Sequence, residues 1–103
     1  MEGEGTMNTW LKCQIGEGQF SGEYAISGTT FDGESFSLFA PEQFVEVNGD
    51  VALGPVEGWI RVEVLAQEGE LSLVSLPRPS LDNGLNITVQ NSQLSARAAQ
   101  QEA

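Results

Sequence analysis

Histidine is absent from this 103-residue chain, which has one cysteine and four basic residues against 15 acidic ones. The chain therefore lacks the side chain that enzymes use most often as a general acid or base, and the commonest metal ligand as well. One cysteine without histidine also disfavours a zinc site. Four cations cannot neutralise a run of phosphates, so we do not expect direct nucleic-acid binding.

Long apolar segments are missing too. No apolar run approaches the roughly 20 residues of a membrane helix, and the acidic first residues do not resemble a secretory signal. Cys13 alone cannot form an intrachain disulfide, which fits a reducing compartment. We therefore expect a cytoplasmic protein, most simply a bacterial one, that does not bind membranes.

The length fits one domain, and composition divides the chain into three parts. Residues 1–8 are rich in glycine and glutamate, and we expect a disordered acidic lead. Residues 92–103 are rich in alanine and glutamine without a wide apolar stripe, which predicts a flexible or weakly helical tail. The folded domain is expected to span residues 9–91.

Within that span, apolar residues recur with a period of two. This alternation is typical of antiparallel strands that bury one face. The predicted apolar series are Leu11, Cys13 and Ile15; Phe20, Tyr24 and Ile26; Phe36, Leu38 and Ala40; Ile60, Val62, Val64 and Ala66; Leu71, Leu73 and Ser75; and Leu85, Ile87 and Val89.

Turn residues separate these series. Asp32-Gly33, Asn48-Gly49 and Glu68-Gly69 each place a glycine where a tight hairpin needs positive φ. Residues 77–84 contain two prolines, which cannot donate to a ladder, so we expect a loop there. The sequence predicts an all-β domain, a small antiparallel barrel or roll of six or seven strands. Its strand lengths resemble an SH3-like barrel, and an OB-like roll or a small sandwich also fits.

Candidate chemistry is sparse. Cys13 shares the predicted core face and has no histidine to activate it, so we interpret it as a small buried hydrophobe. The acidic residues fall mostly at turns and on polar faces, as a solvated surface would place them. The calcium-loop and phosphate-loop spacings are absent, and Asp82-Asn83-Gly84 reads as a turn. The sequence predicts no catalytic residue, no cofactor and no metal.

One local pattern stands out from this acidic background. Trp10 and Trp59 fall on the polar faces of their strands, and each precedes a cation by two residues, Lys12 and Arg61. Residues two apart on a strand share a face. Exposed tryptophan and arginine are frequent interface anchors, which makes these four residues a candidate protein-binding surface. The alternative is structural: each indole covers a barrel end or packs across strands on the cationic stem.

These observations favour a non-catalytic protein-binding or adaptor module that uses the face bearing tryptophan and arginine, and a homodimer is compatible with it. A second hypothesis is an acidic decoy that occupies a basic, nucleic-acid-binding protein, because a net charge of -11 accelerates encounter with such a partner. An enzyme would require a deep pocket with facing carboxylates, and no recognisable catalytic set is present.

Overall fold

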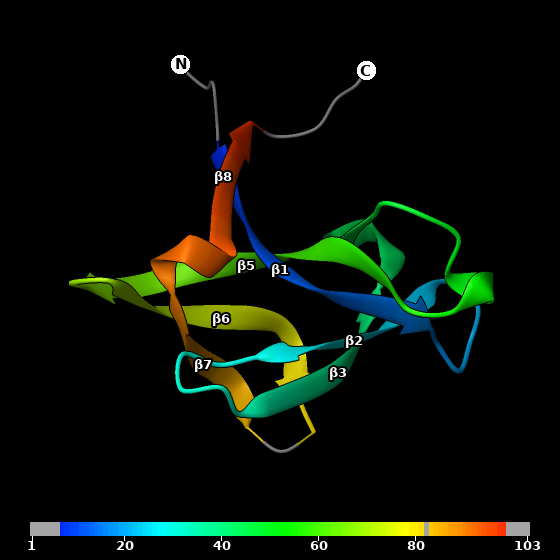
Figure 1. The fold of residues 1–103 in the computed structure, drawn as a ribbon, viewed down its shortest axis with the longest axis horizontal. Helices are drawn as coiled ribbons and strands as arrows, with labels where there is room; N and C mark the ends of the chain where they lie inside the picture. Colours follow the sequence, from blue (N-terminus) through cyan, green and yellow to red (C-terminus); the bar gives the residue numbers. More distant parts are fainter. Residues whose placement is uncertain (1–6, 82, 99–103) are drawn as a thin grey trace.

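The structure, a computed structural model, describes residues 7–81 and 83–98. Antiparallel strands dominate it, and the prediction of an all-β barrel or roll is confirmed (Figure 1). The strands are β1 (Met7–Glu17), β2 (Glu23–Thr29), β3 (Ser35–Pro41), β4 (Val45–Val47), β5 (Val56–Glu68), β6 (Leu71–Ser80), β7 (Gly84–Gln90) and β8 (Leu94–Ala98). Three single turns of 3-10 helix connect them: η1 (Glu42–Phe44), η2 (Val51–Leu53) and η3 (Asn91–Gln93).

The long strand β5 determines the shape of the roll. The main path of the sheet is β3-β2-β1-β5-β6-β7, with β4 paired to β5 and β8 paired to β1. The first half of β5 pairs with β1 and its second half with β6, with an irregularity in register between Val64 and Ala66. A bulge of this kind bends a strand, so β6 and β7 can turn back beneath β5.

Two backbone hydrogen bonds join the ends of the curled sheet. The N–H of Phe31, in the turn after β2, donates to Thr88 of β7 at 2.9 Å. The N–H of Leu81, just after β6, donates to Ser37 of β3 at 2.8 Å. The two ends of the path are therefore joined through single bonds between a turn and a strand, rather than through a continuous ladder.

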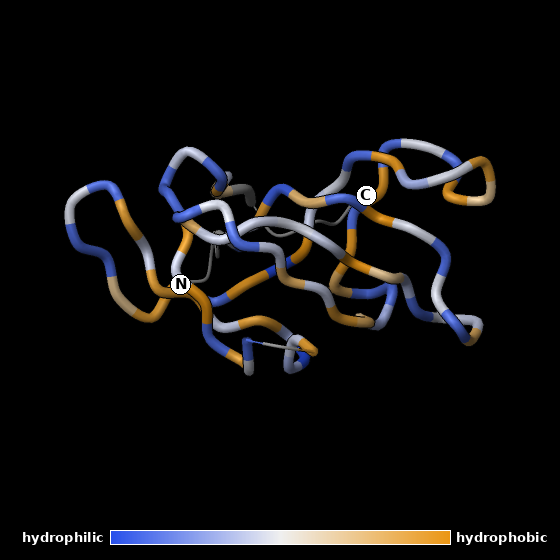
Figure 2. Tube along the Cα trace, turned by 60° about the horizontal axis from the view of Figure 1, so that its bottom comes forward, coloured by the Kyte–Doolittle hydropathy of each residue, from blue (hydrophilic) through white to orange (hydrophobic). Residues whose placement is uncertain are grey.

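The core follows the predicted period of two over most strands, and hydrophobic and hydrophilic residues alternate along the trace (Figure 2). Four details differ from the expectation, and two of them are Ala66 of β5 and Leu85 of β7, which are exposed although the sequence placed them on the inner face. On β6 the buried series is Ser72, Val74 and Leu76, and Leu73 faces outward. Both faces of this segment are rich in leucine and valine, so the sequence alternation did not identify the inner one. Phe20 precedes β2 and is 73% exposed, so it lies outside the core to which the sequence assigned it.

The expected tail contains an additional strand. Where the sequence predicted a flexible or weakly helical segment from Ser92, β8 pairs antiparallel with the first half of β1, and Leu94 packs against the core. Strand β2 pairs with the same edge of β1 only from Gln14 onward. Strand β8 therefore pairs with backbone groups in the first half of β1 that would otherwise have no strand beside them. Figure 1 shows β8 and the start of β1 rising side by side from the roll.

The other boundaries also shift. Strand β1 begins at Met7, two residues before the expected start of the domain, and residues 1–6 and 99–103 lie outside the described part. Strand β6 continues through Pro77 and Pro79 to Ser80, although its register with β7 breaks after Ser75. An extended edge tolerates proline where no ladder bond is required, which explains why the expected loop is partly strand.

Candidate functional site

The register between β1 and β5 brings the four candidate residues into one cluster. Trp10 lies opposite Arg61, and Lys12 lies opposite Trp59. The intervening pair of Leu11 and Ile60 is fully buried in the core. Since directly opposed residues share a face and successive residues alternate, all four side chains belong to the outer face of the sheet. We refer to these four residues as the Trp–cation face.

Trp10 is the most enclosed member of this face. Its side chain is only 7% exposed, even though its strand position points away from the core. Strand β8 flanks it on one side, with Ser95 directly opposite, and Arg61 of β5 flanks it on the other. Its indole Nε1–H is buried and has no hydrogen-bond partner in the described structure. Trp10 therefore supports the face from beneath and offers little surface of its own to a partner.

Arg61 packs on an aromatic ring, though not on an indole. Its guanidinium carbon lies 4.9 Å from the ring centroid of Phe44, the last residue of η1. A contact of this kind contributes about 0.5–1 kcal/mol at exposed sites, and it holds the guanidinium in one place. Phe44 is the functional residue that the sequence pattern missed. Only the fold shows which cation it contacts, because η1 brings it to Arg61.

A hollow of about 610 Å³ adjoins Arg61. Strand β4 leaves β5 near Ile60, and β6 joins β5 at Glu63, so a gap remains between them. The residues that line the hollow include Thr9, Phe44, Arg61, Val64, Ser75 and Pro77. The guanidinium thus lies at the border of a concave surface, which is the shape that protein partners and ligands occupy.

Lys12 and Trp59 form the more exposed half of the face. The Lys12 ammonium lies 3.6 Å from the Glu57 carboxylate, and both side chains are more than half exposed. An ion pair this exposed contributes little to stability, so Lys12 can exchange Glu57 for a partner's carboxylate at low cost. Trp59 is half-buried between Lys12 of β1 and Glu46 of β4.

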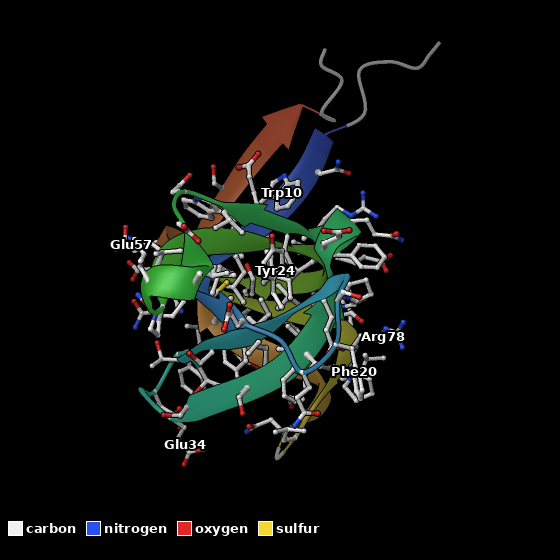
Figure 3. The ribbon with its side chains drawn as sticks, turned by 90° about the vertical axis from the view of Figure 1, so that its right-hand side faces the viewer. Trp10, Phe20, Tyr24, Glu34, Glu57 and Arg78 are labelled. Carbon is white, nitrogen blue, oxygen red and sulfur yellow. The ribbon has the colours of Figure 1, made fainter. Side chains whose placement is uncertain are left out.

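Charge is distributed unevenly around the molecule. Lys12 and Arg61 belong to the Trp–cation face, and the backbone register pairs Arg97 of β8 with Asn8 beside it. Two of the four cations of the chain therefore lie on this face, and the backbone of a third lies beside it. The fourth, Arg78, projects from β6 well apart from Trp10 (Figure 3). Glu46, Glu57 and Glu63 share the outer face with these cations, so carboxylates and cations lie side by side there.

Two observations on the described residues bear on catalytic and metal chemistry. Burial raises the pKa of the Cys13 thiol to about 12, so it remains protonated and unreactive at neutral pH. No three acidic or cysteine side chains in the described ranges converge as a set of metal ligands. Within the same ranges, no helix has the length and apolarity needed to cross a membrane.

The fold and this site together define a small acidic β-roll with a mixed aromatic and cationic outer face. Comparison with protein-family models, curated proteins and solved structures finds no match.

Proposed function

We propose that this chain is a non-catalytic protein-binding or adaptor module whose contact surface is the Trp–cation face. The observation that carries the proposal is the register that places Trp10 opposite Arg61 and Lys12 opposite Trp59. In this arrangement Trp59, Arg61 and Lys12 are the contact residues, and Trp10 holds the strands beneath them.

The energetics of interfaces favour this surface. Tryptophan and arginine dominate binding hot spots because they combine large apolar area with directional hydrogen bonds. Phe44 orients the Arg61 guanidinium beside the hollow, so little side-chain entropy is lost when a partner binds there. A partner with an apolar group and a carboxylate or carbonyl acceptor suits these residues.

Affinity capture from native lysate with matched arginine variants tests the proposal. We expect Arg61→Ala and Trp59→Ala each to remove a specific partner that the unchanged protein captures. Arg78→Ala makes the same change in net charge on a different part of the surface, and it should capture the partner normally. Equal capture by Arg61→Ala and Arg78→Ala would refute the Trp–cation face as the binding surface.

A charge-driven regulator is the second candidate, because the net charge of -11 creates a strong field around a small protein. Such an acidic decoy of a basic, nucleic-acid-binding protein should lose its partner between low and moderate salt. It should also be insensitive to Trp59→Ala, which leaves the net charge unchanged. The same capture at two salt concentrations therefore separates the two functions.

The proposal includes the finer features expected from the sequence. We infer an SH3-like arrangement within the observed roll, a cytoplasmic setting in a bacterium, and no direct binding of nucleic acid. The single buried cysteine supports a reducing compartment. A homodimer formed through the same face is compatible with the geometry, and sedimentation of the unchanged protein and the Arg61→Ala variant tests it.

A further inference from the structure

A second surface feature lies on the outer face of β1, β2 and β3. Two rows of residues cross these strands: Gln14, Ser27 and Ser37 form one, and Gly16, Ala25 and Phe39 form the other. Most of these side chains are small, so the surface is hollowed by about 230 Å³. We call this hollow the apolar depression; its floor comprises Gly16, Ala25, Ser27 and Ser37, and its rim includes Phe39 and Leu81.

The rim of the depression contains apolar residues that leave its floor uncovered. The backbone N–H of Leu81 donates to Ser37 at 2.8 Å, which holds Leu81 at the border of the floor. Its side chain is nevertheless 66% exposed. Pro55, in the segment before β5, borders the depression from the β1 side. Apolar groups therefore border a floor that no side chain among the described residues fills.

The size of the depression limits what it can hold. Ligand sites for small molecules usually enclose about 300–1,000 Å³. A hollow of about 230 Å³ is smaller than that range and suits one large apolar side chain. The hydroxyls of Ser27 and Ser37 and the amide of Gln14 supply polar groups along one side, where the backbone of a bound segment could form hydrogen bonds.

The charges around the depression indicate which residues flank that apolar side chain in a partner. The two rows of the depression contain no ionisable residue, although the chain carries 15 carboxylates. Carboxylates flank it instead: Glu57 lies opposite Gln14 across β1 and β5, and Glu23 lies two residues before Ala25 on the same face of β2. Glu57 pairs with Lys12 only at the exposed surface, and Glu23 Oε2 accepts the backbone N–H groups of Gln19 and Phe20. The net charge of -11 on the whole chain adds a general attraction for cations.

We propose that the apolar depression binds an extended segment of a partner protein in which one aromatic or branched apolar side chain is flanked by lysine or arginine. The apolar side chain enters the hollow above Ala25 and Ser27. The flanking cations lie toward Glu23 and Glu57. Most of its floor lies on β2 and β3, next to the part of the Trp–cation face on β1, so the site extends beyond the proposed contact residues and can be tested without them.

The test is an NMR titration of the full chain with two capped synthetic peptides, Lys-Lys-Phe-Lys-Lys and Lys-Lys-Ala-Lys-Lys. We expect the phenylalanine peptide to shift the amides of Gly16, Ala25, Ser27 and Ser37. It should bind at least about tenfold more tightly than the alanine peptide, because burial of an aromatic side chain is worth about 1.5–3 kcal/mol and tenfold in affinity is about 1.4 kcal/mol.

A matched pair of variants locates the binding. Ser27→Leu fills the depression, whereas Thr29→Leu adds the same side chain two residues further along the outer face of β2. We expect Ser27→Leu to lower the affinity for the phenylalanine peptide about tenfold, and Thr29→Leu to change that affinity less than twofold. Ala25→Val, a smaller filling change, replaces Ser27→Leu if the latter loses its dispersed amide spectrum.

Three results would overturn this proposal: no binding of the phenylalanine peptide at millimolar concentration, equal binding of the two peptides, or tight binding that survives the filling variants. Equal binding of the two peptides would mean that charge alone attracts them. Trp59→Ala should leave the titration unchanged, so failure of the Trp–cation face and failure of the depression are distinguishable.

Discussion

Replacement of Trp10 gives the sharpest test of how the Trp–cation face is supported. The indole is 7% exposed despite its outward strand position, because β8 and Arg61 flank it. Removing a buried aromatic side chain typically costs about 3–5 kcal/mol. A small domain has a total stability of about 5–15 kcal/mol, so Trp10→Ala should lose a large part of it.

Trp10→Phe separates packing from hydrogen bonding. The phenyl ring retains much of the apolar contact and removes the buried Nε1–H that has no partner. An unsatisfied buried donor costs about 1–3 kcal/mol, which offsets most of the packing lost with the smaller ring. We therefore expect Trp10→Phe to lie within about 1 kcal/mol of the unchanged protein.

Urea unfolding followed by far-UV circular dichroism measures both variants, with the free energy extrapolated to water. Trp59→Ala is the control, and it should cost less than Trp10→Ala because Trp59 is only half-buried. A loss below about 1 kcal/mol for Trp10→Ala would refute the reasoning, since it would place the indole in solvent.

Two further predictions concern the core beneath this face. A Cβ at Gly58 would overlap the carbonyl oxygen of Glu46 and come within 2.6 Å of the Ile15 Cγ1, so Gly58→Ala should destabilise the fold by about 1–3 kcal/mol in thermal unfolding. The pKa of Cys13 is about 12 in the fold and near 9.0 when unfolded. The buried neutral thiol therefore contributes fully to the free energy of unfolding below pH 9, and this contribution is lost as pH rises towards 12. The unfolding free energy should fall by up to about 1.4 kcal/mol per pH unit in that window. Cys13→Ala should show a shallower slope, and an identical slope would contradict the burial of the thiol.

The strand pattern was the part of the fold most accessible from the sequence. Alternation predicted the inner faces of β1, β3 and the first half of β5 because one face of each is apolar and the other polar. It failed for β6, where Leu73 and Val74 make both faces apolar. Alternation also missed β8. This strand forms because an open edge of β1 is available to it, and the paired residues Leu11 and Leu94 are 83 positions apart in sequence, so local propensity does not reveal the pairing.

The sequence predicts which residues form the candidate site, but it does not predict how exposed each side chain is. The spacing of Trp10 from Lys12 and of Trp59 from Arg61 predicted two residues on a shared face, and the register of β1 with β5 joined the two pairs. Trp10 is buried because strand β8 lies beside it, and the sequence predicts a flexible or weakly helical tail where β8 forms. The contact of Arg61 with Phe44 depends on the turn η1 and could not be read from periodicity.

Site-specific photocrosslinking tests the central claim most directly. Benzoyl-phenylalanine is placed at Trp59 in one protein and at Leu73 in another. Leu73 is exposed and pairs with Ala66, roughly 23 Å further along β5 at about 3.3 Å per residue. The account predicts that position 59 crosslinks the partner captured by the unchanged protein and that position 73 does not. Crosslinking from position 73 without crosslinking from position 59 would contradict it.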